Sequence, residues 1–258
     1  MQHTRRNSIK DMLIDLGFVN VQELADKFGV TTETIRRDLE QLEQEGAARR
    51  VRGGAVSIQQ PKVQSESAYD LRKESFAAEK TAIARVAADL ICDGDTVIIS
   101  TGTTALETAS MLRNKRDVTV ITSSLPAAME LAGAEGVRVF CLGGFVNVDD
   151  YSVSGSMALD NLGMFNPNKL IAGVGGITIE NGLTDYRMDE SSLLRNFIDK
   201  VDVMIGVADH SKFGKVARYN ICPASRLDYL VTTDATPASQ YAPFEEIGVR
   251  VIAAEMER

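Results

Sequence analysis

The sequence predicts an α/β protein made of two unequal domains, and three observations support this prediction. In residues 1–56, short amphipathic segments of helical period are separated by glycines. From Ser75 to the end of the chain, apolar runs alternate with segments of helical period. Between them, residues 57–74 are polar and contain Pro61, which is typical of a linker. The 258 residues fit two domains of about 100–200 residues each.

One segment organises the first domain, and its two faces differ in character. Within residues 31–46, three aliphatic side chains recur at helical spacing: Ile35, Leu39 and Leu42. Thr31 or Thr32 is available as the N-cap, and Gly46 as the C-terminal stop. The other face carries Thr34, Arg36 and Arg37. Most charged helix faces are simply solvated, but a helix that is held by leucines and presents arginines outward can also lie in a DNA groove.

The flanking segments favour DNA binding. Residues 21–28 predict a short helix that ends at Gly29, and the turn that follows has the length of a helix-turn-helix. Residues 48–56 alternate in hydrophobicity and turn at paired glycines, which suits a two-stranded wing. The arginines of this wing are Arg49, Arg50 and Arg52. Helix, turn, helix and basic hairpin together describe a winged helix-turn-helix.

The start of the chain completes this domain. Residues 5–16 predict an amphipathic helix behind the other two, and residues 18–21 a short strand that can pair with the wing. Arg5 and Arg6 lie at the start of that helix, where they can meet phosphate groups. The candidate DNA contacts are Thr32, Thr34, Arg36, Arg37, Arg49, Arg50, Arg52, Arg5 and Arg6.

These 56 residues resemble the DNA-binding domain of the DeoR family of bacterial sugar-metabolism regulators. The resemblance is carried by TIRRDLEQLEQEG at residues 34–46 and RRVRGGA at residues 49–55. It implies a transcriptional repressor that binds double-stranded operator DNA.

Charge is an objection to DNA binding, because the chain carries 28 Lys+Arg against 36 Asp+Glu, a net charge of −8. Its distribution weakens the objection, since residues 1–56 hold nine basic and nine acidic groups and the arginines cluster in the predicted reading helix and wing. A neutral module binds phosphates modestly, so we expect affinity to come from several joined copies. The family resemblance likewise implies a homodimer or homotetramer.

Composition points to a soluble, cytoplasmic protein. With 44% hydrophobic residues, the chain has no apolar run near the roughly 20 residues of a membrane span and no apolar leader. Cys92, Cys141 and Cys222 are scattered in apolar surroundings and are expected to be reduced thiols in the core. No Cys/His cluster suggests a metal, and we expect no cofactor.

In the second domain, buried strands alternating with helices predict a mainly parallel sheet covered on both faces. The predicted strands are residues 96–99, 118–121, 137–142, 170–174, 201–207, 227–231 and 249–253. Ligands of such sheets bind at the carboxyl ends of the strands. The first of these loops contains Ser100, Thr101, Gly102, Thr103 and Thr104 and leads directly into a helix. Gly/Thr turns are often only helix caps, but hydroxyls, a glycine and a helix N-terminus also make a phosphate cradle.

Other strand ends are also polar or rich in glycine, and together they outline one pocket. The candidate residues are Thr122, Ser123, Ser124, Gly143 and Gly144. Lys212, after the fifth strand, is the natural counter-charge for a phosphate, although it can equally be a surface lysine. The segment between the fourth and fifth predicted strands holds Asp185 and Glu190, which can hydrogen-bond sugar hydroxyls or form a solvated acidic loop.

The second domain resembles the DeoR sensor domain and, more distantly, ribose-5-phosphate isomerase. The stretches that carry this resemblance begin with EKTAIARVAADLICDGDTVIISTGTT and continue with GLTDYRMDESSLLR and ADHSKFG. The resemblance implies that the STGTT loop and Lys212 hold a sugar phosphate, with Lys80 near another phosphate-binding lysine. Where the isomerase has Gly-Ala-Asp-Glu, this chain has Gly173, Val174, Gly175 and Gly176, so the acidic pair is missing.

We therefore predict a repressor of carbohydrate genes that is modulated by a phosphorylated sugar and is not an enzyme. A sugar-phosphate isomerase with a DNA-binding appendage is one alternative, and a sugar-phosphate-binding protein whose helix-turn-helix contacts protein is another. A hydrolase is disfavoured because neither His3 nor His210 belongs to a nucleophile motif. An NAD site is disfavoured because residues 173–176 lack the GxGxxG spacing and residues 177–183 suggest a turn.

Overall fold

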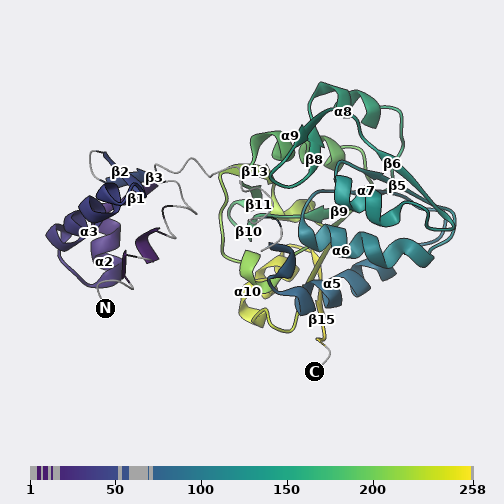
Figure 1. Ribbon diagram of the computed structural model, residues 1–258. Coiled ribbons are helices and arrows are strands. Elements are labelled where there is room, and N and C mark those ends of the chain that lie inside the picture. Colours follow the sequence, from purple (N-terminus) through teal and green to yellow (C-terminus); the bar gives the residue numbers. More distant parts are fainter. Residues whose placement is uncertain are drawn as a thin grey trace. The chain divides into compact units, whose positions relative to one another are not determined.

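The computed structural model describes residues 5–6, 8–10, 13, 18–51, 54–57, 69 and 72–256 (Figure 1). The chain divides into two compact units, Met1–Gln64 and Ser65–Arg258. Each unit is described by itself below. Among the described residues, no helix has the length and apolar character needed to cross a bilayer.

Among its described residues, the first unit contains helical residues at 5–6, 8–10 and 13, where the sequence predicts the first helix, two further helices and a small antiparallel sheet. The helices are α2 (Val21–Phe28) and α3 (Thr32–Gln44), and the strands are β1 (Phe18–Asn20), β2 (Ala48–Val51) and β3 (Gly54–Ser57). The strand order is β1-β3-β2, so β1 pairs with the wing as the sequence predicts. Arg52 and Gly53, between β2 and β3, and Gly17 lie outside the described residues.

Local chemistry explains where α3 begins. Gly29 has φ +61°, a left-handed conformation that glycine adopts without a steric cost, and it ends α2. Thr31 is the N-cap, and its hydroxyl accepts a hydrogen bond from the Thr34 N–H at 3.3 Å. The predicted stripe of Ile35, Leu39 and Leu42 is buried, each side chain being at most 1% exposed. This stripe packs in one core with Ile9, Leu13, Val19, Leu24, Ala25, Ala47, Ala48 and Ala55.

The second unit is built on a seven-stranded sheet in which every neighbouring pair of strands is parallel. Its order is β15-β14-β12-β9-β4-β5-β6. In chain order the strands are β4 (Thr96–Ile99), β5 (Val118–Thr122), β6 (Val137–Cys141), β9 (Lys169–Gly173), β12 (Val203–Val207), β14 (Tyr229–Thr233) and β15 (Arg250–Ala254). The predicted parallel sheet is confirmed.

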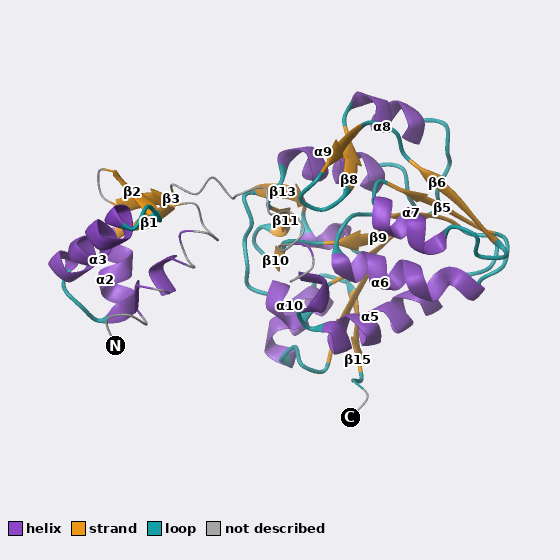
Figure 2. Cartoon of the chain, in the orientation of Figure 1, coloured by secondary structure: helices purple, strands orange, loops and turns teal. Residues whose placement is uncertain are grey.

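Helices cover both faces of this sheet (Figure 2). One face packs against α5 (Ala77–Asp89), α6 (Thr103–Met111) and α7 (Leu125–Leu131). The other packs against α8 (Ser156–Leu162), α9 (Met188–Ile198) and α10 (Ala238–Glu246). Successive residues of a strand alternate between the two cores, as Ile98 and Ile99 do. Three 3₁₀ turns also occur among the described residues: η1 (Leu112–Asn114), η2 (His210–Lys212) and η3 (Ala224–Arg226).

Two small antiparallel sheets were not predicted. One pairs β7 (Phe145–Asn147) with β8 (Ser152–Ser154), and the other has the order β10-β11-β13, with β10 (Gly176–Thr178), β11 (Gly182–Asp185) and β13 (Tyr219–Cys222). The prediction of a turn at residues 177–183 is therefore wrong, because most of this stretch forms the two strands of a hairpin. Strands of three or four residues are too short to produce a clear alternating pattern.

The cysteines also differ from prediction. All are free, but Cys92 and Cys141 are exposed rather than in the core, and Cys222 is partly buried. Cys92 follows α5, and Cys141 lies on the edge strand β6, which has a sheet neighbour on one side. An apolar stretch of sequence does not reveal that its strand lies at an edge. Burial raises the pKa of the Cys222 thiol to about 11.

Candidate functional site

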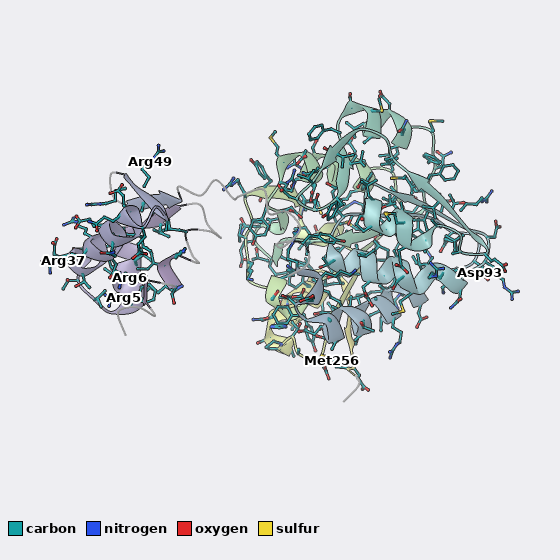
Figure 3. All side chains as sticks on the ribbon, viewed as in Figure 1. Arg5, Arg6, Arg37, Arg49, Asp93 and Met256 are labelled. Atoms are coloured by element: carbon teal, nitrogen blue, oxygen red, sulfur yellow. The ribbon has the colours of Figure 1, made fainter. Side chains whose placement is uncertain are left out.

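The first unit presents arginines at its surface. The side chains of Arg36 and Arg37 on α3 are 54% and 76% exposed. Each lies 3.7 Å from a carboxylate oxygen of Glu33, which is itself exposed. Exposed ion pairs of this kind contribute only about 0–1 kcal/mol. Both guanidinium groups therefore stay available to another anion, and Figure 3 shows Arg37 and Arg49 pointing away from the body of this unit.

The wing is tied to α3 through Arg50. Its guanidinium Nη1 lies 2.5 Å from Glu40 Oε1, and its backbone N–H donates to Glu43 Oε1 at 2.8 Å. These contacts fix the wing beside the C-terminal half of α3. Arg49 is exposed, whereas the predicted contact Arg52 lies outside the described residues.

The arginines of the first helix have partners within the unit. Arg5 Nε donates to Asp38 Oδ2 at 2.6 Å, and Asp38 is only 2% exposed. Arg6 lies 3.5 Å from Glu45. Removing either partner of a buried ion pair leaves an uncompensated charge. Arg5 therefore stabilises the position of α3 from behind, a role that the sequence did not suggest.

The second unit contains a cavity of about 140 Å³ at the carboxyl ends of β4 and β9. Its lining comes from the loop after β4, the loop after β9, the β11–α9 connection and η2. The lining residues that the sequence predicts are Thr101, Gly102, Thr103, Thr104, Asp185, Glu190 and Lys212. This edge of the sheet is where doubly wound folds bind ligands.

The N-terminus of α6 opens onto this cavity. Gly102 is its N-cap with φ +108°, and no side chain of the described residues caps the first turn. The first backbone N–H groups of α6 are thus oriented for an anion. The loop after β4 packs closely against Gly173. A Cβ at this position would lie 2.7 Å from the carbonyl oxygen of Thr101, so a larger residue would displace the loop.

Two cations lie in the lining. Lys212 ends η2, whose N-cap Asp209 accepts a hydrogen bond from the Ser211 N–H at 3.0 Å. Burial lowers the pKa of Lys212, and the nearby charge of Asp209 opposes this effect. Arg72 is the second cation, and it lies within the predicted linker. The second compact unit begins before it and also includes the buried Tyr69.

Carboxyl groups also line the cavity. Glu190 accepts hydrogen bonds from Thr101 Oγ1 at 3.3 Å and Ser152 Oγ at 3.2 Å. Burial, followed by the neighbouring Asp150 and Asp185, raises the pKa of Glu190 to about 9. Burial also raises the pKa of Asp185, although backbone N–H groups oppose it. The raised pKa favours the protonated carboxyl, which can both donate to and accept from a hydroxyl group, and Arg187, whose Nε lies 3.1 Å from Glu190 Oε1, opposes this effect.

Other predicted effector residues do not line the cavity. Ser100 and Ser123 line a small adjoining void, and Ser100 Oγ accepts a hydrogen bond from the Gly173 N–H at 2.9 Å. Thr122 donates to the Ile99 carbonyl and Ser124 caps α7, so both hold the sheet edge. Outside the lining lie Gly143, Gly144 and Lys80, of which Gly143 donates its N–H to Asn161.

Sequence reasoning missed several lining residues, namely Arg72, Asp150 and Tyr186. Arg72 stands in a polar stretch that has linker composition, and Asp150 follows the short strand β7. Gly173, Val174 and Gly175 also line the cavity. The sequence shows that the acidic pair of the isomerase is missing here, but it does not show that these residues face a ligand.

Comparison with known proteins agrees with both halves of this architecture. The model of the DeoR-like helix-turn-helix domain matches residues 5–61, and that of the DeoR C-terminal sensor domain matches residues 75–234. The chain belongs to the DeoR family. It is a DNA-binding transcriptional regulator, as its relatives are, and not an enzyme.

Similar DeoR-family proteins align over most of their length. The HTH-type transcriptional repressor GlcR of Bacillus subtilis (strain 168) is 33% identical, covering 99% of this chain and 98% of that protein. The glycerol-3-phosphate regulon repressor of Escherichia coli (strain K12) is also 33% identical, covering 92% of each chain. A solved ribose 5-phosphate isomerase A from Methanocaldococcus jannaschii aligns over 52% of each chain, with 16% identity and a TM-score of 0.38.

Proposed function

We propose that this DeoR-family regulator represses genes of carbohydrate metabolism and that a phosphorylated sugar in the cavity modulates its affinity for operator DNA. The composition of the cavity lining carries the proposal. Lys212, Arg72 and the N-terminus of α6 supply positive potential, and Asp150, Asp185 and Glu190 supply carboxyl groups. A phosphate suits the positive groups, and sugar hydroxyls suit the carboxyl groups.

The size of the cavity and the names of relatives support the same ligand class. A volume of about 140 Å³ is well below the roughly 300–1,000 Å³ of sites that enclose drug-sized molecules. A small metabolite fits this scale better than a dinucleotide does. The name of the Escherichia coli relative refers to the regulon of a phosphorylated polyol, glycerol 3-phosphate.

On the DNA side, Thr34, Arg36 and Arg37 enter the major groove while the wing arginines hold phosphates or the adjacent minor groove. Arg36 and Arg37 are the exposed cations of α3, and Arg49 and Arg50 are exposed cations of the wing, of which Arg50 is paired with Glu40. Thr32, at the first turn of α3, lies where it can contact a phosphate. We further propose a homodimer or homotetramer that acts in the cytoplasm, since helix-turn-helix proteins commonly bind paired half-sites.

Fluorescence-anisotropy titration tests both parts of the proposal. The DNA is the region upstream of the protein's own gene, at fixed salt, with and without a panel of pentose, hexose and triose phosphates and their unphosphorylated counterparts. We expect one phosphorylated compound to change the affinity while its unphosphorylated counterpart does not. Loss of the response in Lys212→Ala would support the cavity as the site. Equal responses to both members of a pair would refute the phosphate preference.

The DNA-reading helix has its own matched pair of variants. Arg37→Ala should weaken DNA binding by about 1–3 kcal/mol if the guanidinium reads a base, and should leave sugar-phosphate binding unchanged. Arg138→Ala removes an arginine of the second unit that is 70% exposed, close to the 76% of Arg37, and should have little effect on DNA affinity. Unchanged DNA affinity in Arg37→Ala would contradict the assignment of α3 as the reading helix.

A further inference from the structure

Residues 72–75 form the part of the chain that leads directly into α5, and three independent contacts converge on them. We infer that Arg72 binds the phosphate of the effector and that residues 72–75 carry the effect of the ligand towards the DNA-binding domain. This inference rests on the proposed function and adds the residue through which binding is coupled to DNA affinity.

The side chain of Arg72 is oriented from within the second unit. Its guanidinium carbon lies 6.0 Å from the ring centroid of Tyr69, and Tyr69 is 6% exposed. Tyr69 in turn packs edge-on against Tyr151, with ring centroids 5.4 Å apart. Arg72 also lines the cavity together with Thr103 and Lys212. An aromatic face thus orients a planar cation beside a lysine and a helix N-terminus, an arrangement that suits a dianionic phosphate.

The backbone of this segment is held by Lys80, the lysine that the isomerase resemblance suggested as a phosphate ligand. Lys80 is 5% exposed, and its ammonium donates to the carbonyl oxygens of Arg72, Lys73 and Ser75. Thr103 Oγ1, in the first turn of α6, also donates to the Arg72 carbonyl, at 3.4 Å. Lys80 is therefore a positioning residue that closes the short helical turn at residues 72–74.

These contacts give residues 72–75 a mechanical role. A phosphate bound at the N-terminus of α6 contacts the first turn of this helix, where Thr103 donates to the Arg72 carbonyl. The same phosphate faces the Arg72 guanidinium. The first unit is joined to the second by the chain that precedes Arg72. A ligand changes DNA affinity only if it favours one protein state over another. The ligand meets this condition if it fixes Arg72. It then favours one conformation of residues 72–75, which lie where the chain from the first unit enters the second.

Two titrations on the full-length protein test the inference. The first measures binding of inorganic phosphate by calorimetry to the wild type, Arg72→Ala, Lys212→Ala and Lys73→Ala. Lys73 is the matched control, since its side chain is exposed and outside the cavity lining, and its replacement by alanine keeps the backbone carbonyl that Lys80 contacts. A lost charged hydrogen bond costs about 1.5–3 kcal/mol, or roughly 10–150-fold in affinity. We expect this loss for Arg72→Ala and Lys212→Ala, and affinity close to wild type for Lys73→Ala.

The second titration separates coupling from binding. For each variant we compare the Kd for DNA with and without a saturating concentration of sugar phosphate. The sugar phosphate is glucose 6-phosphate, or whichever member of the panel acts on the wild type. We expect the ratio of these two Kd values to approach 1 in Arg72→Ala and to stay at its wild-type value in Lys73→Ala. Arg72 is exposed, so its replacement should leave the fold intact.

The outcomes distinguish this inference from the proposed function. If Lys212→Ala loses phosphate affinity while Arg72→Ala behaves like Lys73→Ala, the inference is wrong and the proposed function stands. The role of residues 72–75 in coupling is also wrong if Arg72→Ala keeps a wild-type ratio at saturation. If the wild type binds neither phosphate nor any sugar phosphate, both the inference and the proposed function fail.

Discussion

The two units of this regulator place their functional polar side chains in opposite environments. On α3, Arg36 and Arg37 are more than half exposed and contact Glu33 only at 3.7 Å. In the second unit, the Glu190 side chain is 11% exposed and is held by hydrogen bonds from Thr101 and Ser152. DNA is a large polyanion and can bind only to an accessible protein surface. A small metabolite that enters a cavity replaces its hydrogen bonds to water by hydrogen bonds to protein groups. One chain can therefore keep arginines solvated for DNA and bury an acidic side chain for contact with a metabolite.

The same difference extends to how each site depends on its surroundings. An exposed arginine keeps its charge and much of its freedom whatever its neighbours are, so α3 needs only a packed apolar stripe behind it. The cavity groups influence one another, since Asp150 and Asp185 both act on the pKa of Glu190. Changes in the first unit should therefore act locally, whereas changes in the cavity should alter the electrostatics of several residues together.

The largest expected effect is on the packing that supports α3. Leu39 is 1% exposed within the first core, so Leu39→Ala should destabilise this unit by about 2–5 kcal/mol. Calorimetric unfolding of the full chain should show a lowered first-unit transition and lost DNA binding, with sugar-phosphate binding retained. Leu39→Met conserves volume and should cost less than about 1.5 kcal/mol. If the second-unit transition falls by the same amount as the first, the two units are not independent in stability.

Per pH unit, a smaller effect is expected at the cavity. In the folded protein the pKa of Glu190 is raised from 4.5 to about 9, chiefly by burial. At a pH between these two values, the folded state therefore holds a proton that the unfolded state has lost. The stabilisation is complete below pH 4.5 and is lost as the pH rises through about 9. Within this window one proton accounts for at most about 1.4 kcal/mol per pH unit, and each kcal/mol shifts the melting midpoint by about 2–4 °C.

Thermal melting from pH 5 to pH 9, which covers most of this window, checks this expectation. The second-unit midpoint should fall with rising pH in the wild type and fall less steeply in Glu190→Gln, which cannot ionise. Glu180→Gln changes an exposed carboxylate and should keep the wild-type slope. Identical slopes for Glu190→Gln and the wild type would show that Glu190 is not protonated in the folded protein.

The smallest effect is expected on the surface of α3. Glu33→Gln removes the carboxylate next to Arg36 and Arg37 and should strengthen DNA binding by less than about 1 kcal/mol. Anisotropy titrations at two salt concentrations can resolve the change, and Glu255→Gln, an exposed carboxylate near the end of the chain, is the control for net charge. Weaker DNA binding by Glu33→Gln would mean that Glu33 orients the arginines rather than competing for them.

Sequence periodicity was sufficient to predict α2, α3 and the parallel sheet, because helical and strand periods depend on which face of a local segment is buried. Apolar stripes such as Ile35, Leu39 and Leu42 are visible without knowing what packs against them. The short sheets formed by β7, β8, β10, β11 and β13 were not predicted, since their pairing depends on partners distant in the chain. The DNA contacts and effector contacts assigned to individual residues stay predictions until the variants are measured.

The sequence by itself determined the family, the two-part architecture and the loop that begins at Ser100, because these follow from motifs and from local periodicity. Tertiary structure decided which polar residues share the cavity. It brought Arg72 from the predicted linker and Asp150 from the β7–β8 connection into the same cavity lining as Lys212, and it placed the Lys80 ammonium against backbone carbonyls of residues 72–75. Burial, charge and pKa depend on groups far apart in the sequence, and only the folded chain brings those groups together.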